Sequence, residues 1–306
     1  MKQFFKNSVL NFLYKLALFV FHKKKTKIIT IQKFKETPSR ANICIFAHYN
    51  KDSRIADYVF HHIESISKLG YLIIFVSSSN VQKKEIDKLK NIASTLIVRK
   101  NIGYDFGSWI EGYKYVSQNT QVQELILTND SIYGPFYELH NIFQKMKSRN
   151  ADFWGMTDSY EISYHIQSYF LWIGPNILRS DVWSEWIQSF VFYPSFLKGA
   201  IIQKYEIGLS KLLRSHGFTF DSYISFLDLV NEISNEEIIK RNLSDSFKNP
   251  TLFLWDFLIL NFQFPYLKRD LVRSKVKRGY NRIQWVSKLK KFQTMMRLIK
   301  IDLQDL

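Results

Sequence analysis

The sequence predicts an α/β protein with a mostly parallel central sheet, and three observations lead to this fold class. Short apolar runs alternate along the chain with segments of helical periodicity, which is the pattern of repeated β-α-β units. The apolar runs are continuous, as in strands that are buried on both faces. A chain of 306 residues with 46% hydrophobic side chains is also long enough to bury one large core.

Five apolar runs are predicted strands, and the segments between them space their apolar residues as helices do. The strands are expected over 42–47, 71–76, 95–98, 125–127 and 152–156, and the helices over 54–69, 83–91, 107–117 and 136–147. Beyond residue 157 the pattern is mixed, with a strand-like segment over 164–173 and a helical one over 206–215. In a sheet of this kind, ligands bind beyond the carboxyl ends of the strands. The polar clusters of the sequence fall at those ends.

The net charge of +16 is concentrated at the two ends of the chain. Residues 1–40 hold ten Lys/Arg and one acid, residues 267–306 hold twelve and three, and the segment between them carries −2. A nucleic-acid-binding protein gathers such charge along its binding groove, so nucleic acid is not an expected partner. The single cysteine excludes a disulfide scaffold and a cysteine-based zinc site, and it fits a reducing compartment.

Both basic ends contain apolar residues. Residues 4–21 form an apolar stretch interrupted by Lys6 and Lys15, which predicts an amphipathic helix on an anionic membrane surface and not a spanning helix. A secretory signal is the alternative, but lysines and no small-residue cleavage site follow the stretch. The basic segment 273–300 is either a helix that caps the domain or a second membrane contact. We therefore expect a membrane-surface segment and linker over 1–40, a central domain over 41–270 and a helical extension over 271–306.

Several common catalytic motifs are missing from the sequence. It contains no G-x-G-x-x-G or Walker sequence, no H-E-x-x-H and no G-x-S-x-G. The segment Asn101–Gly107 comes nearest to a glycine-rich phosphate loop without matching one. These absences disfavour a dinucleotide-dependent enzyme, a P-loop enzyme, a zinc protease and a serine hydrolase.

The clearest chemical candidate is Asp130, which follows the predicted strand 125–127 with Asn129 beside it. A lone carboxylate and amide suit Mg²⁺ or Mn²⁺, because such ions keep waters and take other ligands from a substrate diphosphate. The alternative is that both side chains cap the turn before Gly134 and Pro135.

Other candidates also have a structural alternative. Asp105 follows Gly103 and suits a base or ribose hydroxyl, or a turn. Glu206 begins the predicted helix 206–215, where an acid also favours the helix dipole. Three polar residues share one face of the predicted strand 164–173, which suits sugar hydroxyls or a half-exposed strand; they are His165, Gln167 and Tyr169.

Taken in order, these segments resemble the rhamnan synthesis protein F family, glycosyltransferases of bacterial surface polysaccharide assembly. The likeness covers about residues 41–270. Its most distinctive run is Asn129-Asp-Ser-Ile-Tyr-Gly-Pro135, and the other matching segments are Ala47–Tyr49, Phe75–Ser77, Asn101–Trp109, Phe153–Gly155, His165–Phe170, Glu206–Ser210, Asn249-Pro250 and Phe264–Lys268. One departure is Asn50, where the family pattern has an acid after His-Tyr; Asp52 lies two residues further on.

The resemblance implies a Rossmann-like glycosyltransferase domain of the GT-A type over 41–270. By that likeness Asp130, with Asn129 beside it, coordinates Mg²⁺ or Mn²⁺ on the diphosphate of a nucleotide-sugar, and Lys268 completes the diphosphate clamp. Glu206 is the implied general base of an inverting transfer. The residues implied around the nucleotide are His48, Tyr49, Ser77, Asn101, Gly103 and Asp105, and those facing the sugar or acceptor are His165, Gln167 and Tyr169.

The resemblance also implies partners and a location. The donor is expected to be dTDP-rhamnose and the acceptor a lipid-linked glycan of a surface polysaccharide or lipopolysaccharide O-antigen. The protein is then expected in the cytoplasm, peripheral on the inner face of the bacterial plasma membrane. The alternative is a non-catalytic assembly factor that binds glycan or lipid, and metal-dependent hydrolysis of a nucleotide-sugar would distinguish the two.

Overall fold

A computed structural model describes residues 19–20, 26–234, 249–273 and 285–304 of the chain. Most of the predicted N-terminal membrane helix and part of the segment 273–300 lie outside these residues. Within the described ranges, no helix is both long enough and apolar enough to cross a membrane.

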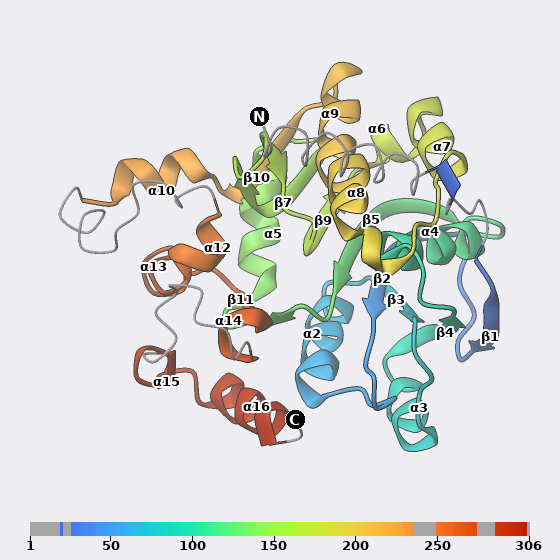
Figure 1. The fold of residues 1–306 in the computed structure, drawn as a ribbon, viewed down its shortest axis with the longest axis horizontal. Helices are drawn as coiled ribbons and strands as arrows, with labels where there is room; N and C mark the ends of the chain where they lie inside the picture. The colour runs from blue at the N-terminus through green and yellow to red at the C-terminus, as the bar shows by residue number, and fades with distance from the viewer. Residues whose placement is uncertain (1–18, 21–25, 235–248, 274–284, 305–306) are drawn as a thin grey trace, which may run out of the picture.

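The core of the fold is a nine-stranded, mostly parallel sheet (Figure 1). Its main path runs in the order β1-β4-β3-β2-β5-β9-β7-β10, and β8 pairs with β7. Strands β4, β3, β2 and β5 are parallel neighbours, whereas β1 and β9 run antiparallel to the strands beside them. The strands are β1 (Ile28–Lys33), β2 (Arg40–His48), β3 (Leu72–Ser77), β4 (Ala93–Arg99), β5 (Gln121–Asn129), β7 (Phe153–Ser159), β8 (His165–Ile166), β9 (Phe170–Ile173) and β10 (Phe220–Ile224).

Helices cover both faces of the sheet, as the continuous apolar strands predict. Along β2, Cys44 and Phe46 belong to one buried cluster and Ile43 and Ile45 to the other. The first cluster includes residues of α2 (Asp57–Ser67), α3 (Lys83–Leu89), α5 (Leu139–Ser148), α10 (Phe226–Glu232), α13 (Trp255–Asn261), α14 (Arg269–Arg273) and α16 (Gln293–Gln304). Helices α12 (Pro250–Phe253) and α15 (Trp285–Lys288) pack against it. The second includes residues of α4 (Tyr104–Val116), α6 (Pro175–Leu178), α7 (Asp181–Gln188), η1 (Ser195–Leu197), α8 (Lys198–Ile201), the π-helical η2 (Ile202–Ile207) and α9 (Gly208–Ser215).

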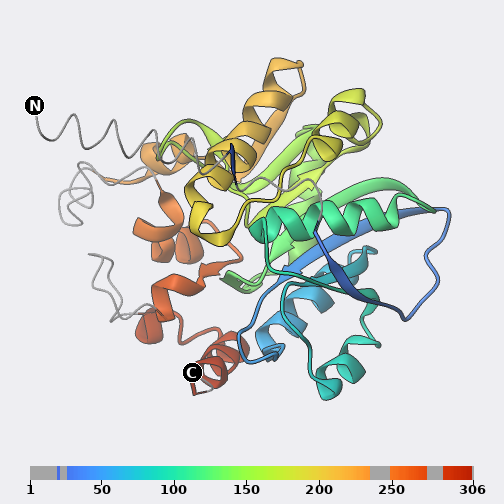
Figure 2. The same cartoon turned by 45° about the vertical axis from the view of Figure 1, so that its right-hand side comes forward.

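The C-terminal helices lie beside α2 and α5, away from α6–α9 (Figures 1 and 2). A small second sheet joins this C-terminal part to the end of β5. In it β11 (Leu267–Lys268) pairs antiparallel with β6 (Ile132–Tyr133), and the Arg269 N–H donates to the Ser131 carbonyl at 2.9 Å. The ladder therefore places Lys268 opposite Ile132 and brings Arg269 into contact with Asp130.

The nine strands and helices predicted over 42–156 are confirmed, with ends that differ by a few residues. Three expectations beyond them were wrong. Residues 28–33, taken as part of a linker, form edge strand β1. The segment 164–173 is two strands, β8 and β9, with a turn at Ser168 and Tyr169. Glu206 does not begin a helix, because α8, η2 and α9 form one continuous helical run and Glu206 lies in its π-helical part.

Candidate active site

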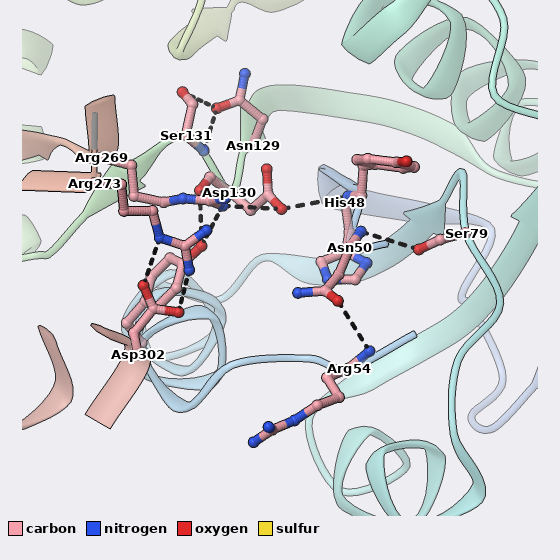
Figure 3. A network of polar contacts seen from close by, with 12 residues as sticks. His48, Asn50, Arg54, Ser79, Asn129, Asp130, Ser131, Arg269, Arg273 and Asp302 are labelled. Carbon is pink, nitrogen blue, oxygen red and sulfur yellow. Dashed lines mark hydrogen bonds and ion pairs between the residues drawn. The ribbon is translucent and has the colours of Figure 1, made fainter. Parts of the chain in front are cut away.

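Asp130 lies directly beyond β5, at the carboxyl edge of the sheet (Figure 3). Its Oδ2 accepts the Tyr49 N–H at 3.3 Å and forms an ion pair with Arg269 Nη1 at 3.3 Å. Its backbone carbonyl accepts a hydrogen bond from Arg269 Nη1 at 2.5 Å and from the Tyr58 hydroxyl at 2.9 Å. Both the main chain and the carboxylate of this residue are thus held by Arg269.

Asn129 connects this carboxylate to a second one. Its Nδ2 donates to Asp105 Oδ2 at 2.9 Å, and its Oδ1 accepts the Ser131 N–H and hydroxyl at 3.1 and 2.6 Å. Burial, together with the nearby Asp130 carboxylate, raises the pKa of Asp105 to about 7. Two carboxylates that repel each other in this way form a site where a cation, or a proton, is favoured.

A buried arginine shapes the loop that presents Asp105. Arg99 ends β4, is only 1% exposed, and donates to the carbonyls of Lys100, Ile102 and Tyr104 at 2.9, 2.6 and 2.6 Å. Gly103 then turns the chain with φ 78°, a conformation that glycine adopts without a steric penalty. The result is that Asp105 falls in the first turn of α4, where the helix dipole favours an acid.

A cavity of about 360 Å³ lies beside these groups. It is lined by residues from the β4–α4 and β5 ends on one side and from the second half of the chain on the other. Its titratable lining residues are Tyr104, Asp105, Glu161, His165, Tyr169, Lys198, Glu206, Lys268 and Asp270. Acids and bases thus face one another across a space large enough for part of a polar ligand.

Glu206 and Lys268 both line this cavity, and they are close enough for the carboxylate to influence the amine. Glu206 Oε1 accepts the N–H and the hydroxyl of Ser168 at 2.9 and 2.8 Å. Lys268 Nζ lies 4.2 Å from the centre of the Tyr169 ring, and burial lowers the pKa of this amine to about 8, against the opposing effect of Glu206. The π-helical turn at Glu206 is typical of functional sites, because it displaces one residue from the regular helical face.

The polar side chains of the β8–β9 region form a separate hydrogen-bonded group on the cavity wall. Gln167 Oε1 accepts from the Thr157 hydroxyl at 2.7 Å, and its Nε2 donates to Asn249 Oδ1 at 3.2 Å. The Tyr169 hydroxyl bonds to Thr157 Oγ1 at 2.7 Å, and the face of its ring contacts the Lys268 ammonium group. The His165 Nδ1 atom lies 2.7 Å from the Ser163 carbonyl, a distance at which its N–H donates.

Comparison with known proteins identifies the family of the chain that forms this site. A family model described as rhamnan synthesis protein F matches residues 73–292. The chain belongs to the rhamnan synthesis protein F family. This confirms the family that the motifs predicted, and membership indicates a role in sugar transfer.

The chain is similar to two curated relatives over about two thirds or more of its length. The virulence protein VirA of Vibrio anguillarum is 26% identical over 278 residues, which cover 82% of this chain and 86% of VirA. An uncharacterized protein of Sinorhizobium fredii, y4gN, is 23% identical over 206 residues, covering 66% of this chain and 53% of y4gN.

The solved structures that the chain resembles are more distant. The glycosyltransferase GlyE of Streptococcus pneumoniae overlaps with a TM-score of 0.39 and 13% identity, covering 86% of this chain and 64% of GlyE. A nucleotide-diphospho-sugar transferase from Desulfovibrio desulfuricans, described as putative in its structure, overlaps with a TM-score of 0.31 and 8% identity, covering 84% and 98% of the two chains. The family assignment depends on neither overlap.

Within this family member, the fold brings most of the predicted site residues together. Those that line the cavity are Asp105, Asn129, His165, Gln167, Tyr169, Glu206 and Lys268. Asp130 stands in the chain between the lining residues Asn129 and Ser131, and its carboxylate accepts the N–H of Tyr49, which is 48% exposed.

The remaining predicted residues lie apart from the cavity lining. His48 and Ser77 are buried, and His48 Nδ1 lies 3.1 Å from Ser77 Oγ, so this hydrogen bond joins the ends of β2 and β3. Burial also lowers the pKa of His48. Gly103 shapes the loop, and Asn101 is exposed outside the lining.

Sequence reasoning missed Arg269, Lys198 and Tyr58. Arg269 directly follows Lys268 in the last matching segment of the family resemblance, and that adjacency is the signal that could have found it. Lys198 and Tyr58 stand in no recognisable motif. Their place in the site depends on how distant segments pack.

The donor atoms at this site fit a divalent metal that arrives with a phosphate ligand. Among the described residues, no group of three or more His, Cys, Asp or Glu side chains could enclose an ion. Mg²⁺ is commonly held by one or two carboxylates plus substrate phosphates and water. Asp130 and Asp105, linked through Asn129, supply such a pair, and their mutual repulsion would be relieved by a cation.

Proposed function

We propose that this protein is a glycosyltransferase that moves a sugar from a nucleotide-sugar to a glycan acceptor. The observation that carries the proposal is the contact between Asp130, directly beyond β5, and Arg269, next to a cavity lined by Asn129, Glu206 and Lys268. This arrangement offers carboxylates and cations at the carboxyl edge of an α/β sheet, where such folds bind their ligands.

The cations of the site would bind the donor diphosphate. Lys268 and Lys198 line the cavity, and Arg269 lies on Asp130 at its edge. A partly buried ammonium group such as that of Lys268 attracts phosphate more strongly than a fully exposed one, because less water screens the interaction. Asp130, with Asp105 beside it, would hold Mg²⁺ or Mn²⁺, which when bound supplies positive charge for the leaving diphosphate.

Glu206 would act as the general base. One of its carboxylate oxygens is occupied by Ser168, which fixes the side chain in the cavity. The acceptor hydroxyl would give its proton to Glu206 as its oxygen bonds to the anomeric carbon, and the bond from that carbon to the diphosphate oxygen would break. An in-line displacement of this kind inverts the anomeric centre. Gln167 and His165 would orient the sugar hydroxyls from the cavity wall.

The finer substrate proposal follows the family description. We propose rhamnose as the transferred sugar, dTDP-rhamnose as the donor and a lipid-linked surface glycan as the acceptor. The concentration of basic residues at both chain ends supports a peripheral position on an anionic cytoplasmic membrane face, with the catalytic domain over 41–270 between the two basic segments.

Thermal unfolding with a panel of nucleoside diphosphates and nucleotide-sugars, with and without Mn²⁺, tests this proposal. A ligand at 100 times its Kd stabilises the native state by about 2.7 kcal/mol, which is readily measured. We expect a metal-dependent shift with one nucleotide family, and Asp130→Asn should abolish that shift and lower transfer by roughly 100-fold or more.

The matched control is Asp158→Asn. Asp158 also lies at the end of a strand, β7, but its Oδ1 accepts the Phe226 N–H at 2.6 Å and it does not line the cavity. It should keep the ligand-induced shift. If no nucleotide stabilises the wild-type protein, the proposal is wrong, and a non-catalytic glycan-binding role becomes the better account.

A further inference from the structure

A chain of buried polar contacts runs from the C-terminal helix α16 to the Asp130 site (Figure 3). Asp302 of α16 is 4% exposed, and it accepts hydrogen bonds from Arg273 Nε at 2.9 Å and from the Tyr133 hydroxyl at 2.5 Å. A second ion-pair contact joins Arg273 Nη2 to its other carboxylate oxygen. Asp302 is therefore fully engaged by α14 and β6.

Both partners of Asp302, Arg273 and Tyr133, are connected to Arg269. Arg273 and Arg269 stand four residues apart on α14, so their side chains lie on the same face of the helix. The Tyr133 ring packs edge-on against the Tyr58 ring with centroids 4.8 Å apart, and the Tyr58 hydroxyl accepts from Arg269 Nη1 at 2.5 Å. Arg269 in turn holds both the carbonyl and the carboxylate of Asp130.

The burial of this network indicates a role other than stability alone. The side chains of Asp130, Arg269, Arg273 and Asp302 are only 14%, 19%, 18% and 4% exposed. Buried ion pairs contribute little net stability compared with apolar side chains of the same size, because removing charges from water is costly. Two like charges four residues apart also repel on a helix, and here each arginine has its own acid: Asp130 beyond β5 for Arg269, and Asp302 of α16 for Arg273.

We propose that Asp302 is a positioning residue for the donor site: by holding Arg273 and Tyr133 it sets Arg269 against Asp130. The C-terminal helix then contributes to donor binding without touching the donor. This inference rests on the proposed function for its catalytic consequence. The position of Arg269 itself can be measured without any ligand.

The experiment compares Asp302→Asn with Asp256→Asn in the full chain. Asp256, on α13, is a close match, because it is also 4% exposed and forms an ion pair with Lys288 of the C-terminal segment. This ion pair is separate from the contacts that hold Asp130. Asp302→Asn should weaken binding of dTDP, UDP or GDP, whichever the wild type binds, by about tenfold, as expected for loss of a supporting contact. Asp256→Asn should leave the affinity unchanged, and Asp302→Glu should restore part of it.

A double-mutant cycle separates positioning from general destabilisation. If Asp302 acts through Arg269, Asp302→Asn should cause no further loss in an Arg269→Ala background. Tyr133→Phe, which removes only a hydroxyl, should show a smaller loss of the same kind. Additive losses, or equal losses in the Asp302 and Asp256 variants, would overturn the proposal.

The ligand-free measurement is the ¹⁵N signal of the Arg269 Nε–H, identified by its disappearance in Arg269→Ala. Asp302→Asn should shift or broaden this signal, and Asp256→Asn should not. If the wild type binds no nucleotide, the proposed function fails while this spectrum still decides the positioning role. An Arg269 signal unchanged by Asp302→Asn would refute it.

Discussion

The site combines two regions that are built in different ways: one carries the carboxylates beyond β4 and β5, and the other carries the cations that face them. Asp105 and Asp130 follow strands of the parallel β4-β3-β2-β5 core, where main-chain ladders and helices on both faces fix the backbone. Lys268 ends the two-residue strand β11 and Arg269 follows it, and both depend on one short ladder and on side-chain contacts. The sheet edge thus supplies the fixed acidic half of the site.

This difference has a functional consequence. A rigid sheet edge holds carboxylates close enough to repel each other, and the cost of that repulsion is what a cation would relieve. The cationic half is held by fewer main-chain bonds, and segments of that kind are the ones that adjust on ligand binding. Predictions that separate the two halves are therefore the most informative.

The largest expected effect is at Glu206, which faces the cavity from the π-helical run η2, outside both regions, and is proposed to act in the chemical step and not in binding. Glu206→Gln removes the proposed base while its amide oxygen can still accept from Ser168. We expect kcat to fall by about 10²–10⁴-fold with little change in the donor KM, as for loss of a general base. Steady-state kinetics with donor and acceptor varied separately would measure this.

Glu161→Gln is the control for that variant. Glu161 lines the same cavity, and its Oε2 accepts from Asn249 Nδ2 at 2.9 Å. It should keep most of kcat. Equal losses of kcat in the Glu206→Gln and Glu161→Gln variants would mean that the total negative charge of the cavity controls the rate, and that Glu206 is not a specific base.

An intermediate effect is expected for Lys268 as the pH rises. Its pKa of about 8 lies below the usual 10.5, so the amine loses its charge above pH 8 in the unliganded protein. Nucleoside diphosphate affinity should then fall by up to about tenfold per pH unit above pH 8, because binding requires proton uptake. Lys268→Arg should flatten this dependence, since arginine stays protonated. Calorimetric titrations between pH 7 and 9.5 would test it.

The Lys268 amine is expected to affect the stability of the protein in the opposite direction from ligand affinity as the pH rises. Between about pH 8 and 10.5 the unfolded chain binds a proton at Lys268 that the folded protein lacks. The free energy of unfolding contributed by this group therefore rises with pH, while ligand affinity falls. Wild-type ligand affinity that stays level across this range would show that Lys268 does not contact the diphosphate.

The two regions also differ in how much of their structure could be predicted from the sequence. The core strands could be predicted because each is a continuous apolar run between turn signals, and Asp130 could be found because it directly follows one. Strand β1 could not, because its residues alternate between half-buried and exposed at the sheet edge. Arg269 could not be placed from local pattern, because its contact with Asp130 depends on the pairing of β11 with β6.

Glu206 illustrates a different limit. Its identity as a site residue came from the family resemblance, and it does line the cavity. Its expected place at a helix start was wrong, because periodicity cannot distinguish a new helix from a π-helical turn within a longer one.

The smallest effect is expected at Asn50, the departure from the family pattern in the first region. Asn50 Oδ1 accepts the Asp52 N–H at 2.8 Å and the Arg54 N–H at 3.5 Å, and its own N–H donates to Ser79 Oγ at 3.1 Å. An aspartate would accept the same two bonds, and Asn50 does not line the cavity. Asn50→Asp should therefore change nucleoside diphosphate affinity by no more than about twofold, as for a substitution outside the binding machinery. Titration calorimetry with and without Mn²⁺ would measure this affinity. A tenfold, metal-dependent gain in affinity would contradict the prediction, because it would extend the donor site past Tyr49 into the β2–α2 loop. The sheet edge that carries the carboxylates would then bind more of the donor than its diphosphate.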